Sequence, residues 1–234
     1  MSTGILGDTI DIHGGGADLE FPHHTNEIAQ SEAKTGKTFA NYWMHNGFVN
    51  IDNVKMSKSL GNFITVHDAL KTIDGQVLRF FFATQHYRKP INFTEKAVRD
   101  AETNLKYLKN TYEQPFTGEV DPADLQGFVD KFIAAMDEDI NAANGITVVF
   151  ELAKWINSGH YNQDVKDALT KMLEVFGVVF VEEVLDADIE VLIAERQEAR
   201  AKKDFARADA IRDQLAAQGI KLLDTKEGVR WTRD

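Results

Sequence analysis

The pattern of apolar residues changes near residue 65, and this change restricts the possible folds more than any other feature. Before it, two short apolar runs, "TIDIHGGGADL" and "YWMHNGFVNI", flank one stretch that carries helix signals. That helix is expected to begin near Pro22 and to end near Lys34, with Gly36 just past its end. A strand, helix, strand order without a hairpin signal favours part of a parallel sheet. The glycine run is expected to form a turn that follows the first strand.

After residue 65 the apolar residues recur at helical spacing, beginning with a helix that Thr65 is expected to cap. Residues 114–124, where prolines and a glycine cluster, and the acidic residues 182–188 are candidate linkers. The last part of the chain is typical of two helices that meet near Asp204, followed by a hairpin that turns at residues 226–228. The sequence therefore predicts an incomplete α/β sheet, then a helical region, then a small C-terminal module.

Composition excludes several classes of protein. The chain has 234 residues and no cysteine, which excludes a disulfide scaffold and fits a cytosolic setting. No apolar run is long enough to span a membrane, so no membrane contact is expected. The formal net charge of −11 argues against a general polyanion binder. Charge is uneven, however: residues 50–109 have 10 Lys and Arg against 6 Asp and Glu, whereas residues 110–189 have 4 against 16. Nucleic-acid contacts are therefore expected at residues 50–109 or near the C-terminus.

The motif "KMSKSLGN" at residues 55–62 indicates phosphate chemistry. Two lysines three residues apart, small hydroxyl residues and a following glycine make a mobile cationic loop. Such a loop can wrap a polyphosphate and stabilise charge that develops on transferring oxygens. The alternative is a polar surface turn that follows a strand.

The motif "FPHHTNE" at residues 21–27 indicates a metal site. His23 and Glu27 are four residues apart, so on a helix they would share one face and could hold the same ion. Two ligands do not complete a zinc site. The alternative is a polar helix start in which Glu27 only supports the helix. His24 is open between lining a site and packing, and Asp18 between capping a helix and a functional role.

Two segments together resemble a known family. "HGGGADLEFPHHTNEIAQ", followed by "NGFVNIDNVKMSKSLGN", resembles the second half of the class I aminoacyl-tRNA synthetase catalytic domain, in particular that of the cysteinyl-tRNA synthetases. The C-terminal segment from "IAERQEARAKKDF" onward also resembles that family. The resemblance implies a partial Rossmann-like α/β half, an all-α helical bundle and a C-terminal module of helices and a hairpin. The implied domains are the catalytic half with its lysine loop (1–64), a helical stem-contact region (65–113), a helical bundle (114–185) and an anticodon-binding module (186–234).

The resemblance also implies an activity and the residues that perform it. The activity is ATP-dependent activation of cysteine and its transfer to tRNA-Cys, with Mg²⁺ accompanying ATP. Lys58, supported by Lys55, is expected to be catalytic, and His13 is expected to lie over the reacting carboxylate or ribose. The residues expected to bind the nucleotide are Lys55, Ser57, Lys58, Ser59, Gly14, Gly15 and Gly16.

The implied metal is Zn²⁺. His23 and Glu27 match two of the family's four ligands, and the other two are cysteines expected upstream of this chain, so zinc binding by the chain itself is expected to be weak or absent. Zinc would distinguish the thiolate of cysteine from the hydroxyl of serine, a difference too small for pocket shape to reject strongly. In the C-terminal module, Arg230, Trp231 and Arg233 are expected to contact unpaired anticodon bases by stacking and hydrogen bonding. The implied complete protein is cytoplasmic and monomeric.

One departure from the family pattern limits the expected activity. The family's first ATP motif, a His-x-Gly-His turn, is absent from the sequence. We therefore expect a C-terminal fragment of a cysteine–tRNA ligase that is inactive by itself. The alternative is a truncated paralogue that binds tRNA without catalysis. A cysteine–amino-sugar ligase is disfavoured, because that family is expected to lack the tail present here at residues 189–234.

Overall fold

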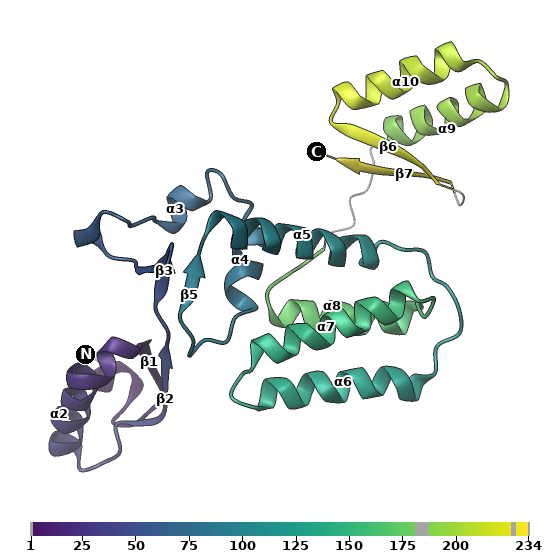
Figure 1. Cartoon of the computed structure of the whole chain (residues 1–234). Coiled ribbons are helices and arrows are strands. Elements are labelled where there is room, and N and C mark those ends of the chain that lie inside the picture. The colour runs from purple at the N-terminus through teal and green to yellow at the C-terminus, as the bar shows by residue number, and fades with distance from the viewer. Residues whose placement is uncertain (1, 181–186, 226–227, 234) are drawn as a thin grey trace. The chain divides into compact units, whose positions relative to one another are not determined.

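The computed structural model describes residues 2–180, 187–225 and 228–233. Contacts divide the chain into two compact units, residues 1–180 and 181–234 (Figure 1). Each unit is described separately below. Among the described residues, no helix is long and apolar enough to cross a membrane.

The first unit begins with the expected strand, helix and strand. Strands β1 (Ile10–Gly16) and β2 (Ala40–Asn46) pair in parallel, and the helices here are α1 (Ser2–Leu6) and α2 (Thr25–Thr35). Gly36 ends α2 in the left-handed conformation, as predicted. The expected glycine turn is wrong, because Gly14, Gly15 and Gly16 are the last residues of β1 and pair with β2. A short 3₁₀ turn (Ala17–Leu19) and a π-helical turn (Glu20–His24), which is kinked at Phe21 because that residue has extended backbone angles, then lead into α2.

The second apolar run forms two strands rather than the one expected. β2 ends at Asn46, and β3 (Val49–Ile51) belongs to another sheet, of order β4-β3-β5, with β4 (Val54–Lys55) and β5 (Ile91–Phe93). β3 is antiparallel to β4 and parallel to β5. The break lies at Gly47, where a Cβ atom would lie 2.6 Å from the backbone nitrogen of Pro90. Gly47 is therefore required by a close backbone crossing, not by a turn.

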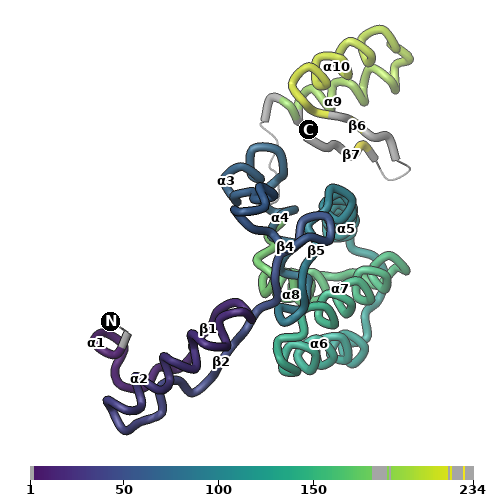
Figure 2. Tube along the Cα trace, turned by 60° about the vertical axis from the view of Figure 1, so that its left-hand side comes forward, coloured from purple at the N-terminus to yellow at the C-terminus, as the bar shows by residue number. Residues whose placement is uncertain are grey.

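Helices form the rest of the first unit. Their bounds are α3 (Val66–Ala69), α4 (Gly75–Ala83), α5 (Glu95–Tyr112), α6 (Pro122–Asp137), α7 (Ala142–Asn157) and α8 (Gln163–Val175). Thr65 caps α3, as predicted, since its side chain accepts a hydrogen bond from the Asp68 amide. Helix α7 packs against α5, α6 and α8 (Figures 1 and 2). Its fully buried residues, among them Leu152 and Ile156, join the main hydrophobic core of the unit.

The second unit contains α9 (Ala187–Ala201), α10 (Phe205–Ala217) and the antiparallel strands β6 (Ile220–Thr225) and β7 (Gly228–Arg233). The predicted meeting of two helices near Asp204 is confirmed, since its side chain caps α10 by accepting from the Arg207 amide. The predicted hairpin is also confirmed, although residues 226–227 at its turn lie outside the described residues. The core of this unit is small and includes Ile211 and Leu215.

Two isoleucines provide a matched test of where the stability of the first unit lies. Ile156 on α7 is 1% exposed, whereas Ile133 on α6 is 50% exposed. We expect Ile156→Ala to lower the free energy of unfolding by about 2–5 kcal/mol, because it leaves a cavity in the core. Ile133→Ala should cost about 1 kcal/mol or less. Urea unfolding of both variants measures the difference, and equal losses would contradict the assigned core.

Candidate active site and nucleic-acid pocket

A cluster of histidines lies where β1 and β2 meet the π-helical turn. The register of the two strands places His13 opposite Trp43 and Gly15 opposite His45. His24 comes from the π-helical turn and is 5% exposed. Its Nδ1 atom lies 2.8 Å from Nε2 of His45, a hydrogen bond that one of the two rings donates. The rings of His13 and His24 also meet edge to face, with centroids 4.6 Å apart.

The glycines of β1 make room for this cluster. A Cβ atom on Gly15 would lie 2.8 Å from Cε1 of His24 and 3.0 Å from Cδ1 of Leu19. Any side chain at this position would therefore displace the buried imidazole. Burial lowers the pKa of His24, and the neighbouring His13 acts in the same direction. His24 is therefore held as a neutral ring, with one nitrogen able to donate and the other to accept.

Glu27 of α2 joins the cluster, whereas His23 does not. Oε2 of Glu27 lies 2.7 Å from Nε2 of His13, and ligand atoms of His13, His24 and Glu27 all lie within 4.8 Å of one another. This oxygen is enclosed yet makes no well-aligned hydrogen bond. The side chain of His23 is exposed and lies outside this group. The expectation that His23 and Glu27 act together at a metal stays a prediction.

The lysine loop is folded into a short 3₁₀ turn (Lys58–Leu60) that follows β4. Asn62 fastens its two sides, because its side chain accepts from the amide of Ser57 at 2.9 Å and donates to the carbonyl of Lys55 at 3.2 Å. Ser57 caps the turn by accepting from the amide of Leu60. Its hydroxyl also lies 3.1 Å from that of Ser59. The sequence reasoning gave no role to Asn62, although its place at the end of the motif was visible.

The two lysines of the loop point to different partners. Nζ of Lys55 lies 3.8 Å from the ring centroid of Phe48 and 3.5 Å from a carboxylate oxygen of Asp18. Asp18 lies two residues after the last glycine of β1, so Lys55 joins the loop to the segment expected to approach the nucleotide. Nζ of Lys58 lies over the ring of Phe63, 5.6 Å from its centroid. Both lysines are thus held by weak contacts that a phosphate could replace.

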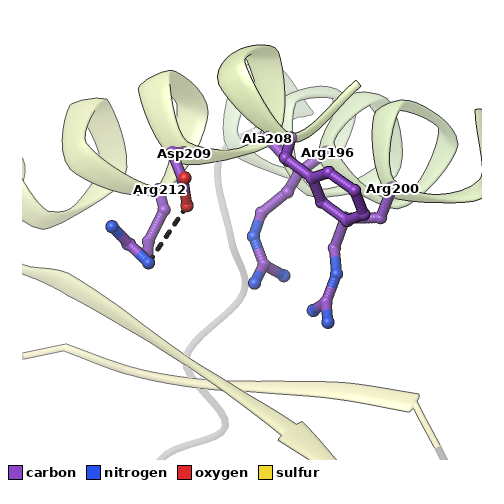
Figure 3. Close-up of a pocket in the computed structure, with 6 residues that line it drawn as sticks. Arg196, Arg200, Ala208, Asp209 and Arg212 are labelled. Carbon is purple, nitrogen blue, oxygen red and sulfur yellow. Dashed lines mark ion pairs between the residues drawn. The ribbon is translucent and has the colours of Figure 1, made fainter. Parts of the chain in front are cut away.

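The second unit has a basic pocket that the sequence reasoning did not identify. It has a volume of about 180 Å³ and lies between α9 and α10 (Figure 3). The side chains of Arg196 and Arg200 extend from α9 in the same direction, and Arg212 of α10 pairs with Asp209 at 3.1 Å. Phe205, 62% exposed, also lines the pocket. The available signal was the spacing of the two arginines, four residues apart on one helix face, ahead of an aromatic residue.

The residues predicted to contact bases lie on β7. Trp231 pairs with Leu222, Arg230 with Leu223 and Arg233 with Ile220 in the strand register. Their side chains lie outside the described part of the structure. Their role in binding nucleic acid stays a prediction.

Comparison with known proteins identifies the class of the fold. Residues 1–103 match the catalytic domain family of "tRNA synthetases class I (C)", residues 131–182 match the DALR domain, and residues 182–231 match the "Cysteinyl-tRNA ligase anticodon binding domain". A LeuRS–tRNA–LeuAMS ternary complex from Agrobacterium radiobacter superimposes with a TM-score of 0.53 at 17% identity, over 71% of this chain and 25% of that one. The structure therefore has part of the fold of the class I aminoacyl-tRNA synthetases.

Sequence relatives narrow the class to one family. Over all 234 residues the chain is 86% identical to the cysteine–tRNA ligase of Streptococcus pneumoniae, 82% to that of Streptococcus mutans and 78% to that of Streptococcus thermophilus. Over its whole length the chain therefore matches cysteine–tRNA ligases. It spans about half the length of these relatives, 52% of each. The resemblance expected from the lysine loop and the histidine motif is confirmed. The bounds of the four predicted domains stay a prediction.

A pair of glycine variants tests the packing of the histidine cluster. Gly15→Ala should displace His24, break its hydrogen bond to His45 and cost about 1–3 kcal/mol of stability through overpacking. Gly127 lies inside α6, and a Cβ atom there would meet nothing within 4 Å. Gly127→Ala should therefore be neutral or stabilise by up to about 1 kcal/mol. Histidine ring NMR and thermal unfolding follow both effects. An unchanged His24 signal in Gly15→Ala would contradict the packing.

Proposed function

We propose that the chain supplies the lysine loop, the histidine cluster and the tRNA-binding modules of an ATP-dependent cysteine–tRNA ligase. The observation that carries this proposal is the contact between Lys55 and Asp18, which joins the lysine loop to the glycine-bearing end of β1. In parallel α/β sheets, ligands bind beyond the carboxyl ends of the strands. This contact supports the proposal that a nucleotide placed against Gly14, Gly15 and Gly16 would present its phosphates to the loop.

The first step of the proposed reaction is an attack by a carboxylate oxygen of cysteine on the α-phosphorus of ATP. A phosphorus–oxygen bond forms to the amino acid, and the bond to the departing pyrophosphate breaks. Lys58 stabilises the negative charge on the pyrophosphate, and Lys55 supports it. The hydroxyl groups of Ser57 and Ser59 donate to phosphate oxygens. Mg²⁺ enters with ATP as part of the substrate.

His13 and His24 form the substrate side of the proposed site. His13 lies on β1 directly before the glycines, close to where the reacting carboxylate or ribose would lie. His24 is a neutral donor and acceptor that His45 orients. Together they would fix the polar groups of the substrate.

The donor set around Glu27 fits Zn²⁺. Imidazole nitrogens and carboxylate oxygens are ligands that zinc accepts, and an enclosed oxygen of Glu27 makes no well-aligned hydrogen bond. His23 and Glu27 are proposed to hold the ion, although the group around Glu27 contains His13 and His24, so His23 would have to turn toward Glu27. The two remaining ligands would come from cysteines outside these 234 residues. Bound there, zinc would supply selective binding of the substrate thiolate over the hydroxyl of serine. Glu27 also contacts His13, and this contact orients the carboxylate of Glu27.

The second unit is proposed to bind the anticodon of tRNA-Cys. The match to an anticodon-binding family supports this role, and the pocket of Arg196, Arg200, Phe205 and Arg212 has suitable chemistry. Guanidinium groups bind phosphates and base edges, and an exposed ring stacks on an unpaired base. Arg230, Trp231 and Arg233 on β7 are proposed to add further contacts.

A second candidate function applies to the chain by itself. The 234 residues contain no cysteine and no His-x-Gly-His turn. The chain alone is therefore proposed to bind tRNA without activating cysteine.

The catalytic proposal is tested in a chimera in which these 234 residues replace their counterpart in the Streptococcus pneumoniae ligase. We expect the chimera to catalyse cysteine-dependent ATP–pyrophosphate exchange, and Lys58→Ala to lower kcat by about 10²–10³-fold. Lys71→Ala is the matched control, since Lys71 is an exposed lysine that pairs with Asp68. Normal activity of the Lys58→Ala chimera would contradict the catalytic role of Lys58. An inactive parent chimera would contradict the proposed reaction.

The tRNA proposal is tested on the isolated chain. Phe205→Ala should weaken binding of a tRNA-Cys transcript by about 1–3 kcal/mol, because a stacking surface is lost. Lys202→Ala is the control, since this lysine pairs with Glu198 and does not line the pocket. Filter binding at fixed salt measures both variants. Equal affinity of Phe205→Ala and the unaltered chain would place the anticodon elsewhere.

A further inference from the structure

The segment of residues 86–91 crosses the base of the hairpin that carries the lysine loop. The amide of Gly47 donates to the carbonyl of Tyr87 at 2.7 Å, and the amide of Ile91 donates to the carbonyl of Phe48 at 2.8 Å. Gly47 also lies too close to the backbone of Pro90 to accept a Cβ atom. β3 begins two residues after Gly47, and β4 ends on Lys55. The position of this crossing segment therefore sets the position of the hairpin.

The same segment is fastened to the turn between α6 and α7. The hydroxyl of Tyr87 donates to Oδ1 of Asp139 at 2.6 Å, and Nη2 of Arg88 donates to the same oxygen at 3.0 Å. Nε of Arg88 donates to the other carboxylate oxygen, Oδ2. A guanidinium bound to both oxygens of a carboxylate has a fixed orientation as well as a favourable energy. We refer to Tyr87, Arg88 and Asp139 as the clamp.

Asp139 is an anion at neutral pH. Hydrogen bonds from Arg88 and then Tyr87 lower its pKa to about 2, and His86 acts in the same direction. Burial and then the hydrogen bond to Asp139 raise the pKa of Tyr87, which keeps its hydroxyl protonated as a donor. The ion pair in the clamp is therefore fully formed throughout the physiological range.

The turn that presents Asp139 has an unusual backbone. Asp139 has a φ of 55° and Ile140 a φ of 52°, in the left-handed region that a β-branched residue such as isoleucine rarely adopts. Backbone hydrogen bonds from the amide of Ile140 to Met136 and from that of Asn141 to Ala135 hold this conformation. Such strain persists only where the surroundings fix it. The carboxylate is thus presented by a rigid turn.

A cavity lies beside the clamp. Its volume is about 300 Å³, and its lining includes Gly47 and Val49 from the start of the hairpin, Tyr87 from the crossing segment and Ile140 from the turn. Side chains therefore leave open part of the space between the hairpin base and the helical bundle. The clamp crosses this region with directional polar contacts. Because packing is incomplete here, these contacts fix the position of the crossing segment relative to the turn that presents Asp139.

We propose that Asp139 is a positioning residue for the lysine loop, acting through Arg88 and Tyr87 on the base of the β3–β4 hairpin. The catalytic consequence rests on the proposed function, whereas the structural consequence does not. Loss of the clamp allows the hairpin base to shift and misplaces Lys58 relative to the phosphates. Because Lys58 acts on charge that develops during the reaction, the change falls on kcat rather than on the KM for cysteine.

The first experiment uses hydrogen exchange of the 234-residue chain and requires no activity. The amide of Met56 donates to the carbonyl of Val49 across the hairpin, and the amide of Ser57 donates to Asn62. Asp139→Asn should increase exchange at both amides by about 5-fold or more, since it removes the ion pair. Asp137→Asn is the control, because Asp137 is an exposed acidic residue two positions away and outside the clamp. Unchanged exchange at Met56 and Ser57 in Asp139→Asn would overturn the proposal.

The second experiment uses the chimera described above and separates positioning from stability. Asp139→Asn should lower kcat for ATP–pyrophosphate exchange by about 10-fold to 100-fold at an unchanged KM for cysteine. Arg88→Gln should have a similar effect, and the double variant should be no worse than either single variant, because all three lose the same interaction. A lower melting temperature with normal kcat would show a purely structural clamp and overturn the proposal. An inactive parent chimera would count against the proposed function instead, and the exchange experiment would still decide the clamp.

Discussion

The parallel pairing of β1 with β2 is the constraint on which the candidate active site depends. The register sets His13 against Trp43 and Gly15 against His45, and it aligns the glycines with the space that His24 occupies. Three buried residues, Ile10, Phe39 and Ala40, form the core of this region, whereas the main core of the first unit lies among α4, α5, α7 and α8. The site is therefore built on the part of the unit with the smaller core, and the helical bundle supplies most of the buried apolar surface. This separation is the physical reason for the proposed role of polar contacts such as the clamp in placing the loop.

The sequence predicted those elements whose signals are local. Capping residues and helical periodicity are properties of neighbouring residues, so the caps at Thr65 and Asp204 and the helix ending at Gly36 were predictable. The strand assignments failed where the deciding contact was distant. Gly47 looks like a continuation of β2 until the backbone of Pro90, some forty residues later, is placed against it. The glycines of β1 look like a turn until His24 is packed against them.

The candidate site follows the same division. The lysine motif and the histidine motif were recognisable as short strings, and the family match confirms the interpretation of both as parts of a synthetase. Which histidine is buried was not recognisable, because His23 and His24 differ only in the direction that the π-helical turn gives them. The arginines of the basic pocket in the second unit and the Arg88–Asp139 pair were not predicted, for two different reasons. Arg196 and Arg200 have a helical spacing that could have indicated a shared helix face. Arg88 and Asp139 are 51 positions apart in the sequence, and no periodic pattern reveals such a pair.

The helical bundle of α6, α7 and α8 differs in charge from the more basic residues 50–109. Residues 110–180, which contain α6, α7 and α8, carry 12 acidic residues against 4 basic ones, and such an excess of acidic residues repels a polyanion. Repulsion contributes to specificity as much as attraction does, because it restricts the orientations that a bound nucleic acid can adopt. Asp139 shows how this acidity is also used inside the fold, since its carboxylate binds Arg88 and leaves one fewer acidic group facing solvent without a partner. Under the function proposed above, the bundle would act on tRNA mainly by exclusion, and under the proposed role of the clamp it would position the lysine loop. The basic residues that would contact phosphates then lie outside it, on the segments before and after.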